Sequence, residues 1–360
     1  MTHFLRDILR QPCELQRTIN YLNGAGRSAL EKATALVRNA RHVFLTGIGS
    51  SWHAALTAGP LFYRSAHPVY MLDAAELLQF SSFPPDSAII VISRSGRSVE
   101  IVNLIAKARE NGTSVIGLTS FEDGPLAQEA HISITIPVAP DHAISVNTYS
   151  ALAAAAGALA VSVVGTFDES LCNSLLGAIA ETEQAIPAWQ AQIAGTTWHV
   201  PGKATYFLAR SPSLGSCHEA RLLWEEGVKS PASAMGTGSF RHGPQEIVTE
   251  GFRFGIWIDG ERIREQDLAV ARDLRRPGTS VMLIGQHLPI DSADLVFQLP
   301  TVPAAWQFLI DIIPAQLAAE RLAGLSGVDC DSFRLCSFIV EDEYGLLHEE
   351  IANSKDAKQR

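Results

Sequence analysis

The sequence has 360 residues, of which 47% are hydrophobic and 18% are charged. This composition is typical of a folded globular protein, and the length favours two domains over one. The net charge is −10 and the 28 lysines and arginines are scattered, so we expect no basic surface for nucleic acid or for an anionic membrane. An anionic ligand would therefore have to be held by local hydrogen-bond donors.

The N-terminus, MTHFLRDILRQP, lacks the apolar stretch and cleavage site of a signal peptide, and we expect a mature start. Five widely spaced cysteines without a C-x-x-C pair predict neither a disulfide framework nor a zinc site, and they fit a reducing cytoplasm best. The uncharged stretch Ile144–Phe167 is long enough to span a bilayer, but it is rich in alanine and contains serines. A helix buried between layers is the better interpretation.

After a polar N-terminal helical segment, short apolar runs alternate with helical patterns. The predicted strands of this first half are His42–Thr46, Val69–Leu72, Ala88–Ser93, Ser114–Thr119 and Ile132–Pro137. Short connections between alternating strands and helices imply right-handed crossovers and a parallel sheet covered on both faces. The first half is thus predicted to be a doubly wound, three-layer α/β domain.

The pattern then begins again after a polar helical stretch from about Glu169 to Gly195. The strands predicted there are Ala204–Ala209, Phe252–Ile258, Ser280–Gly285 and Leu295–Leu299, followed by one long helix over Ala304–Leu325. Because TGIGSSW and ARSPSLGS both follow a first strand, we infer an internal duplication. The predicted segments are an N-terminal helical segment (1–25), a first domain (26–168), a helical linker (169–198), a second domain (199–345) and a frayed polar tail (346–360).

In an open α/β sheet, ligands bind at the carboxyl ends of the strands, where helix N-termini present unpaired amides. The loop Gly47–Trp52 offers a G-x-G start, and Asp73 after the next strand could hold a ribose. However, Trp52 occupies the third glycine position of a dinucleotide fingerprint, and an indole there would block close packing of helix on strand. A dinucleotide site is therefore the weaker interpretation.

The second loop, Ser93–Ser98, reads SRSGRS and lies between the apolar run AIIVI and a predicted helix over Val99–Asn111. Three hydroxyls and several backbone amides would converge there, which is what a phosphate monoester needs. The alternative is that Ser98 only caps the helix and the other serines are turn residues. One capping serine is ordinary, but three hydroxyls at the end of a buried strand favour phosphate.

The segments TGIGSSW, ISRSGRSVE and GSFRHGPQEIV together resemble the signature loops of the sugar isomerase (SIS) domain family, in order and over nearly the whole chain. The pattern is similar to the isomerase half of glucosamine-6-phosphate synthase, and to tandem SIS deaminases, ketose/aldose isomerases and fructosamine 6-phosphate deglycases. The resemblance implies two SIS domains and a hexose 6-phosphate or amino-sugar 6-phosphate as substrate, without cofactor or metal. Because no glutaminase domain is recognised, full synthase activity is not expected.

The resemblance also assigns site residues. It places a catalytic glutamate on Glu226 and a ring-opening histidine on His242, 16 residues apart as in the family. Alone, each would be taken as an ordinary surface residue. Phosphate and sugar contacts fall on Ser51, Ser93, Arg94 (where the synthase has glutamine), Ser95, Ser98, Asn147 and Thr148.

One carboxylate could move a proton between C1 and C2 of an open-chain sugar, and a histidine could assist ring opening near neutral pH. A lysine from the synthase's C-terminal tail aligns with Cys336, which fits deaminases and deglycases whose substrates bring their own amine. We assign Cys336 no role, because lone cysteines are usually small buried hydrophobes.

The resemblance further implies a homodimer in which the histidine loop completes the neighbouring subunit's site. The alternative function is a non-catalytic regulator that binds a sugar phosphate, since fold does not determine function. Such a protein would need the serine loops but not Glu226 or His242.

Overall fold

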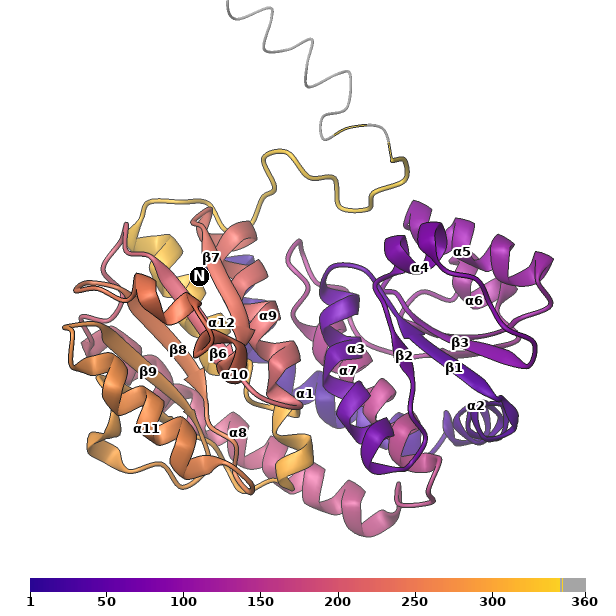
Figure 1. The fold of residues 1–360 in the computed structure, drawn as a ribbon, viewed down its shortest axis with the longest axis horizontal. Coiled ribbons are helices and arrows are strands. Elements are labelled where there is room, and N and C mark those ends of the chain that lie inside the picture. The colour runs from indigo at the N-terminus through magenta and orange to yellow at the C-terminus, as the bar shows by residue number, and fades with distance from the viewer. Residues whose placement is uncertain (344, 346–360) are drawn as a thin grey trace, which may run out of the picture.

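The computed structural model describes residues 1–343 and residue 345, and the tail predicted over 346–360 lies outside the described residues. Two α/β units lie side by side, each built on a five-stranded parallel sheet (Figure 1). In the first sheet the order is β2-β1-β3-β4-β5. Its strands are β1 (His42–Thr46), β2 (Tyr70–Met71), β3 (Ser87–Ile92), β4 (Ser114–Thr119) and β5 (Ile132–Thr135).

Helices cover both faces of this first sheet because successive strand residues point to opposite sides. In β3, Ile90 and Ile92 join the core beneath α3 and α7, whereas Ile89 and Val91 join the core beneath α4 and α5. The helices of this unit are α2 (Arg27–Asn39), α3 (Ser50–Arg64), α4 (Ala74–Phe80), α5 (Val99–Glu110), α6 (Pro125–Glu129) and α7 (Asn147–Ser162).

The second sheet has the order β10-β9-β8-β6-β7, which repeats the order of the first. Its strands are β6 (Thr205–Ala209), β7 (Ala232–Gly236), β8 (Arg253–Trp257), β9 (Ser280–Gly285) and β10 (Leu295–Gln298). The helices that follow the first sheet are α8 (Glu169–Gly195), α9 (Ser213–Leu223), α10 (Thr237–Phe240), α11 (Arg264–Arg275) and α12 (Ile313–Leu325), with short turns η1 (Trp224–Val228), η2 (Pro244–Ile247), η3 (Ile290–Ser292) and η4 (Ala304–Leu309).

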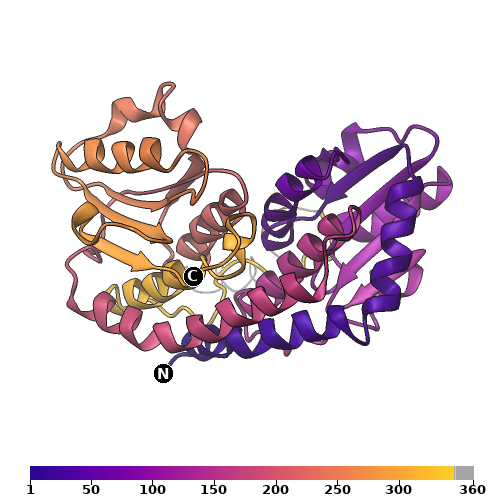
Figure 2. The ribbon, with the colours of Figure 1, turned by 90° about the horizontal axis from the view of Figure 1, so that it is seen from below.

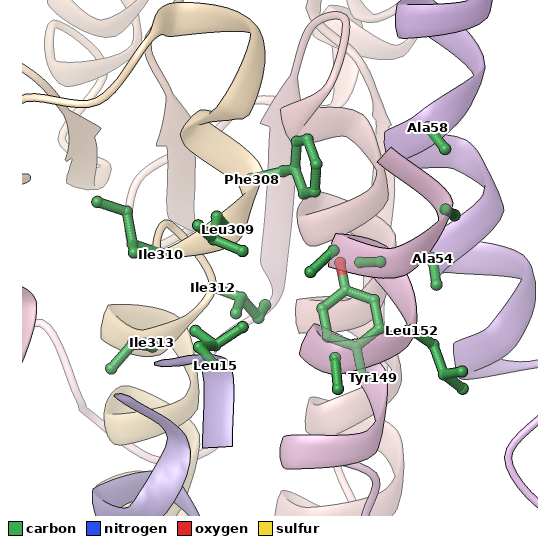
Figure 3. Close-up of a cluster of buried hydrophobic side chains, with 14 of the residues drawn as sticks. Leu15, Ala54, Ala58, Tyr149, Leu152, Phe308, Leu309, Ile310, Ile312 and Ile313 are labelled. Atoms are coloured by element: carbon green, nitrogen blue, oxygen red, sulfur yellow. The ribbon is translucent and has the colours of Figure 1, made fainter. Parts of the chain in front are cut away.

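Two long helices join the units. The first helix, α1 (His3–Asn23), lies beside α8, and together they run along the base of both units (Figure 2). A single hydrophobic core then continues from one unit to the other. Figure 3 shows part of it, where Tyr149 of α7 faces the segment from Phe308 to Ile313 and Leu152 points to the helix that carries Ala54.

The apolar stretch that could have been a membrane span is α7, which is buried along its whole length. Among the described residues, none of the helices combines the length and the hydropathy needed to cross a bilayer. Burial between the units explains the alanine-rich composition, because small side chains let neighbouring helices approach closely.

Two predicted features were wrong. The strand β7 (Ala232–Gly236) was missed, because its sequence ASAMG has low strand propensity and is only half-buried at the sheet edge. The single helix predicted over Ala304–Leu325 is two elements, η4 and α12, interrupted at Ile310–Ile312. Pro314 in the first turn of α12 explains the break, since a proline there lacks the amide that would continue a helix from the N-terminal side.

The two units meet most closely where α9 crosses α3. A Cβ on Gly215 would lie 2.4 Å from Thr57 Cγ2 and 2.5 Å from the carbonyl oxygen of His53. We expect Gly215→Ala to push the helices apart and to lower the free energy of unfolding by about 1–3 kcal/mol. Denaturant unfolding of the wild-type and variant proteins would measure this difference in free energy.

The matched control for this substitution is Gly177→Ala in α8, where an added Cβ meets nothing within 4 Å. Alanine favours a helix over glycine by up to about 1 kcal/mol, so this control should be neutral or slightly stabilised. Equal effects at the two positions would contradict the close crossing.

Candidate functional site

A cavity of about 300 Å³ opens between the two units at the carboxyl ends of the first sheet. Its volume is at the lower end of the range for small-molecule sites. Three parts of the chain supply the walls: loops of the first unit, the α9–η1 region of the second, and the C-terminal segment 333–340. This segment crosses from the second unit to the first (Figure 1).

The serine loop after β3 forms one end of the cavity, with Ser93, Ser95 and Ser98 all in the lining. Ser93 Oγ accepts a hydrogen bond from the amide of Gly96 (3.0 Å), and Ser95 Oγ accepts one from the amide of Arg97 (3.2 Å). Gly96 has a φ of +66°, which favours glycine at this turn. The hydroxyls are thus held inside a tight loop, and they face the cavity.

The alternative that Ser98 is only a helix cap does not match its geometry. Ser98 stands at the N-cap position of α5, but its side chain makes no capping hydrogen bond. The first amide of α5, that of Val99, instead donates to the carbonyl of Val340 in the C-terminal segment (3.0 Å). The N-terminal amide of α5 therefore donates to an oxygen at the edge of the cavity. Helix N-termini of this kind favour the binding of anions.

The loop after β1 forms the adjacent wall. Ser50 and Ser51 begin α3 and line the cavity. Gly47 allows this tight strand-to-helix turn, because a Cβ there would lie 2.6 Å from the carbonyl of Ser51. The loops after β1 and β3 thus face one ligand space.

Arg94 ties the serine loop to its surroundings. Its guanidinium donates to Ser145 Oγ (3.2 Å) and to the carbonyls of Ala143 (3.4 Å) and Phe338 (3.0 Å). It also stacks 3.9 Å from the centroid of the Phe338 ring. Burial lowers the pKa of Arg94 from its ordinary value, against the opposing charges of Asp141 and Glu226. Of the described lining residues, it is the one basic side chain.

Asn147 and Thr148 were assigned to sugar contacts, but both are 1% exposed and outside the cavity lining. Their side chains donate to the carboxylate of Asp141 (2.8 and 2.6 Å), which also accepts their backbone amides. A carboxylate of the chain thus already occupies the N-terminus of α7. The same loop reaches the cavity through Ser145 instead.

Glu226 faces the serine loop from the second unit and lies in the π-helical turn η1. Such turns are common at functional sites because they redirect side chains. Burial, reinforced by the negative charge of Glu219, raises the pKa of Glu226 to about 7, while Arg94 and Lys229 oppose the shift. A carboxyl group with this pKa can both accept and return a proton near neutral pH.

His242 lies elsewhere. It is exposed in the loop between α10 and η2, and it is not among the residues that line the cavity. Its backbone amide donates to the carbonyl of Ser239 (3.1 Å), and the glycine that follows it has a φ of +130°. Within one chain, the structure therefore does not bring His242 to Glu226.

Cys336 does line the cavity, with Phe333 and Ser337 of the C-terminal segment. Partial burial and the charge of Glu226 raise the pKa of its thiol, which disfavours a reactive thiolate. Sequence reasoning missed most of this segment, as well as Glu100 and Leu222. No local pattern in the sequence indicates that a segment more than 100 residues from Glu226 folds over it.

The equivalent loop of the second unit is closed. It also has six residues, Ile258–Ile263, between β8 and α11, but none is a serine. Asp259 Oδ1 accepts the amides of Glu261 (2.9 Å) and Arg262 (2.6 Å). A carboxylate of the chain thus occupies this loop, whereas uncharged serine hydroxyls take that place in the loop of the first unit.

This arrangement defines an α/β protein with a cavity where helix N-termini meet the carboxyl ends of a parallel sheet. Residues 36–162 match the family model of the SIS domain. The first unit is therefore similar to a SIS domain over these residues. This agrees with the resemblance seen in the sequence motifs.

Curated relatives point the same way. The chain is 24% identical over 302 residues to a glutamine–fructose-6-phosphate aminotransferase (isomerizing) of Sulfolobus acidocaldarius, covering 83% of this chain and 50% of the relative. It is 23% identical to the protein of the same name from Pyrobaculum aerophilum, covering 92% of this chain and 56% of the relative. The chain thus spans about half the length of the curated relatives it matches.

Solved structures share the fold over nearly the whole chain. The C-terminal domain of the Francisella tularensis glucosamine-fructose-6-phosphate aminotransferase has a TM-score of 0.82 at 17% identity, covering 92% of this chain and 98% of that one. Glucosamine-6-phosphate deaminase of Thermotoga maritima scores 0.79 at 21% identity, with 94% and 99% covered. Tagatose-6-phosphate ketose/aldose isomerase of Escherichia coli scores 0.78 at 19% identity, with 96% and 97% covered.

Proposed function

We propose that the chain is a sugar-phosphate isomerase or deaminase that acts on a hexose 6-phosphate or a ketosamine 6-phosphate, with two SIS domains in tandem. The observation that carries the proposal is one cavity in which a hydroxyl-rich helix N-terminus faces a carboxyl group with a pKa of about 7. The repeated strand order supports the tandem arrangement and the internal duplication. Five free cysteines support a reducing compartment such as the cytoplasm.

In this proposal the phosphate binds at Ser93, Ser95 and Ser98 with help from Ser51, which leaves C1 and C2 of the open chain toward Glu226. Glu226 removes a proton from one of these carbons and returns it to the other, so that aldose and ketose interconvert. With a ketosamine, the same transfer yields an imine, and one water then hydrolyses it to the aldose phosphate and a free amine. Of the described residues lining the cavity, none is a lysine, which favours a substrate that brings its own amine.

The exposed position of His242 supports a homodimer in which this residue enters the partner's cavity to assist ring opening. An active monomer in dilute solution, observed by sedimentation during turnover, would rule out this part of the proposal.

The test of the function is incubation with hexose, hexosamine, hexulose and ketosamine 6-phosphates in D₂O, followed by product identification. We expect conversion of at least one compound, with deuterium incorporated at C1 or C2. Tight binding without conversion or exchange would contradict the enzyme and support a sugar-phosphate-binding regulator instead.

The rate of the correct reaction should depend on pH through Glu226. Because burial raises the pKa of this carboxyl to about 7, it is mostly protonated, and inactive as a base, below that pH. We expect kcat/KM to reach a plateau above about pH 7 and to fall about tenfold for each pH unit well below it. Steady-state kinetics from pH 5.5 to 8.5 would show the profile.

A substrate phosphate also titrates near pH 6. The control is therefore the Kd of an unreactive phosphate analogue over the same range. A rate that follows only this Kd, or that stays flat from pH 5.5 to 8, would count against Glu226 as the base.

A further inference from the structure

A second glutamate lies beneath the cavity, between the two units. Glu219 of α9 is 0% exposed. Its Oε1 accepts the hydroxyl of Ser50 (3.0 Å), and its Oε2 lies 2.7 Å from Nδ1 of His53, which is itself buried. Burying a carboxylate is costly unless it is paired and hydrogen-bonded. Here both oxygens are held by one helix of the other unit, α3.

Glu219 is placed to act on both walls of the cavity. It precedes Glu226 by seven residues on the continuous helical stretch formed by α9 and η1. Its partner Ser50 lines the cavity beside Ser51. The close crossing at Gly215, one turn before Glu219, brings α9 against the backbone of His53. A single buried carboxylate therefore links the helix that carries Glu226 to the helix that begins at the serine wall.

We propose that Glu219, held by His53 and Ser50, is a positioning residue for Glu226 that fixes the distance between the base and the phosphate loop. This proposal rests on the proposed role of Glu226 as the base. Neither Glu219 nor His53 lines the cavity, so they act through Glu226 and the loop rather than on the substrate.

The charges around the pair support an effect of Glu219 on Glu226. Glu219 is the largest contribution after burial to the raised pKa of Glu226. The pKa of His218, which stacks 5.8 Å from the His53 ring, is lowered to about 4 by burial, then by His53 and Arg221, so it is neutral at pH 7. Arg94 and Lys229 also face the two glutamates, and they lower the pKa of Glu226. The remaining ionisable groups nearby are Glu225, Arg221, Cys336 and the buried Tyr149.

The electrostatic part can be tested without turnover. In protein labelled with ¹³C at the glutamate carboxyl carbons, the resonance lost in Glu226→Gln identifies Glu226, and its titration is followed in the unliganded protein. In Glu219→Gln we expect the midpoint to move down by about half a pH unit. The matched control is Glu225→Gln, which removes an equal charge from the exposed neighbour that pairs with Arg221 (2.6 Å). Solvent screening should leave the control midpoint nearly unchanged.

The positioning part is tested by kinetics with the substrate found above. His53→Gln keeps the carboxyl group of Glu219 but replaces its rigid partner, so we expect kcat lowered about tenfold and KM within about twofold. Glu219→Gln should lower kcat similarly and move the acid limb of the pH profile to lower pH. If Glu219→Gln does not fold, His53→Gln alone still tests the positioning role.

Equal midpoints in Glu219→Gln and Glu225→Gln would overturn the electrostatic role, and wild-type kcat in both Glu219→Gln and His53→Gln would overturn the positioning role. Failure of the proposed function looks different. In that case no sugar phosphate is converted by the wild-type protein, yet the Glu226 midpoint still responds to Glu219→Gln.

Discussion

Replacing Glu226 by glutamine is expected to lower turnover by ~10²–10⁴-fold while binding of the sugar phosphate stays nearly unchanged. Glutamine keeps the size of the side chain and its hydrogen bonds, but it cannot accept a proton from carbon. Because the phosphate is proposed to bind at the serine loop on the opposite wall, its Kd should not depend on this carboxyl. Steady-state kinetics measures turnover, and deuterium exchange at C1 and C2 measures proton transfer. Calorimetry with an unreactive analogue measures the Kd.

The control for this variant is Glu225→Gln. Glu225 lies on the same π-helical turn, but it is exposed and does not line the cavity. Its substitution should leave turnover within about twofold of wild type, as is usual for surface changes. If Glu226→Gln kept the wild-type rate and Glu225→Gln lost it, the base would have been misassigned by one residue.

The second large effect is expected at the serine loop. Ser95→Asp should weaken binding of a phosphate analogue by ~10²-fold or more, because placing like charges side by side costs several kcal/mol. The aspartate can still accept the amide of Arg97, as Ser95 does, so the loop should keep its shape. The second unit provides the precedent, since Asp259 already closes the equivalent loop there. Calorimetric titration of each variant with the same unreactive sugar-phosphate analogue gives the Kd.

Two further variants separate charge from folding. Ser95→Ala removes one neutral hydrogen bond and should cost only about tenfold in Kd, while Ser174→Asp adds the same charge on the exposed face of α8 and should have no effect. Wild-type affinity in Ser95→Asp would place the phosphate elsewhere. Thermal unfolding of all three variants checks that each is folded.

Much of the fold was predictable because its signals are local. Apolar runs of four to seven residues identified nine of the ten strands in the described part of the chain, since buried parallel strands need continuous apolar sequence. The strand β7 escaped because its residues are small and half-buried, so its pairing with β6 depends on the neighbouring strand rather than on its own propensity. The break between η4 and α12 escaped because helical spacing of apolar residues continues through it.

The candidate site was predictable only in part, for the same reason. Ser93, Ser95 and Ser98 stand within six residues at a strand end, where topology alone brings hydroxyls to a helix N-terminus. Asn147 and Thr148 also stand near a strand end, but their side chains donate hydrogen bonds to Asp141. This contact depends on how the loop before α7 folds. No pattern in the sequence distinguishes Glu219 from an ordinary acidic residue on a helix.

By itself, then, the sequence determined the alternation of strands and helices, the return of that alternation in the second half, and the hydroxyl groups of the loop SRSGRS, because each depends on neighbours in the chain. The tertiary structure alone decided which groups share a cavity. It brings Glu226 opposite the serine loop and folds residues 333–340 over both. It also buries Glu219 against His53, 166 residues away. The contact between Glu219 and His53 depends on the packing of α9 on α3 and on the loss of water between these helices. No short pattern in the sequence predicts this packing.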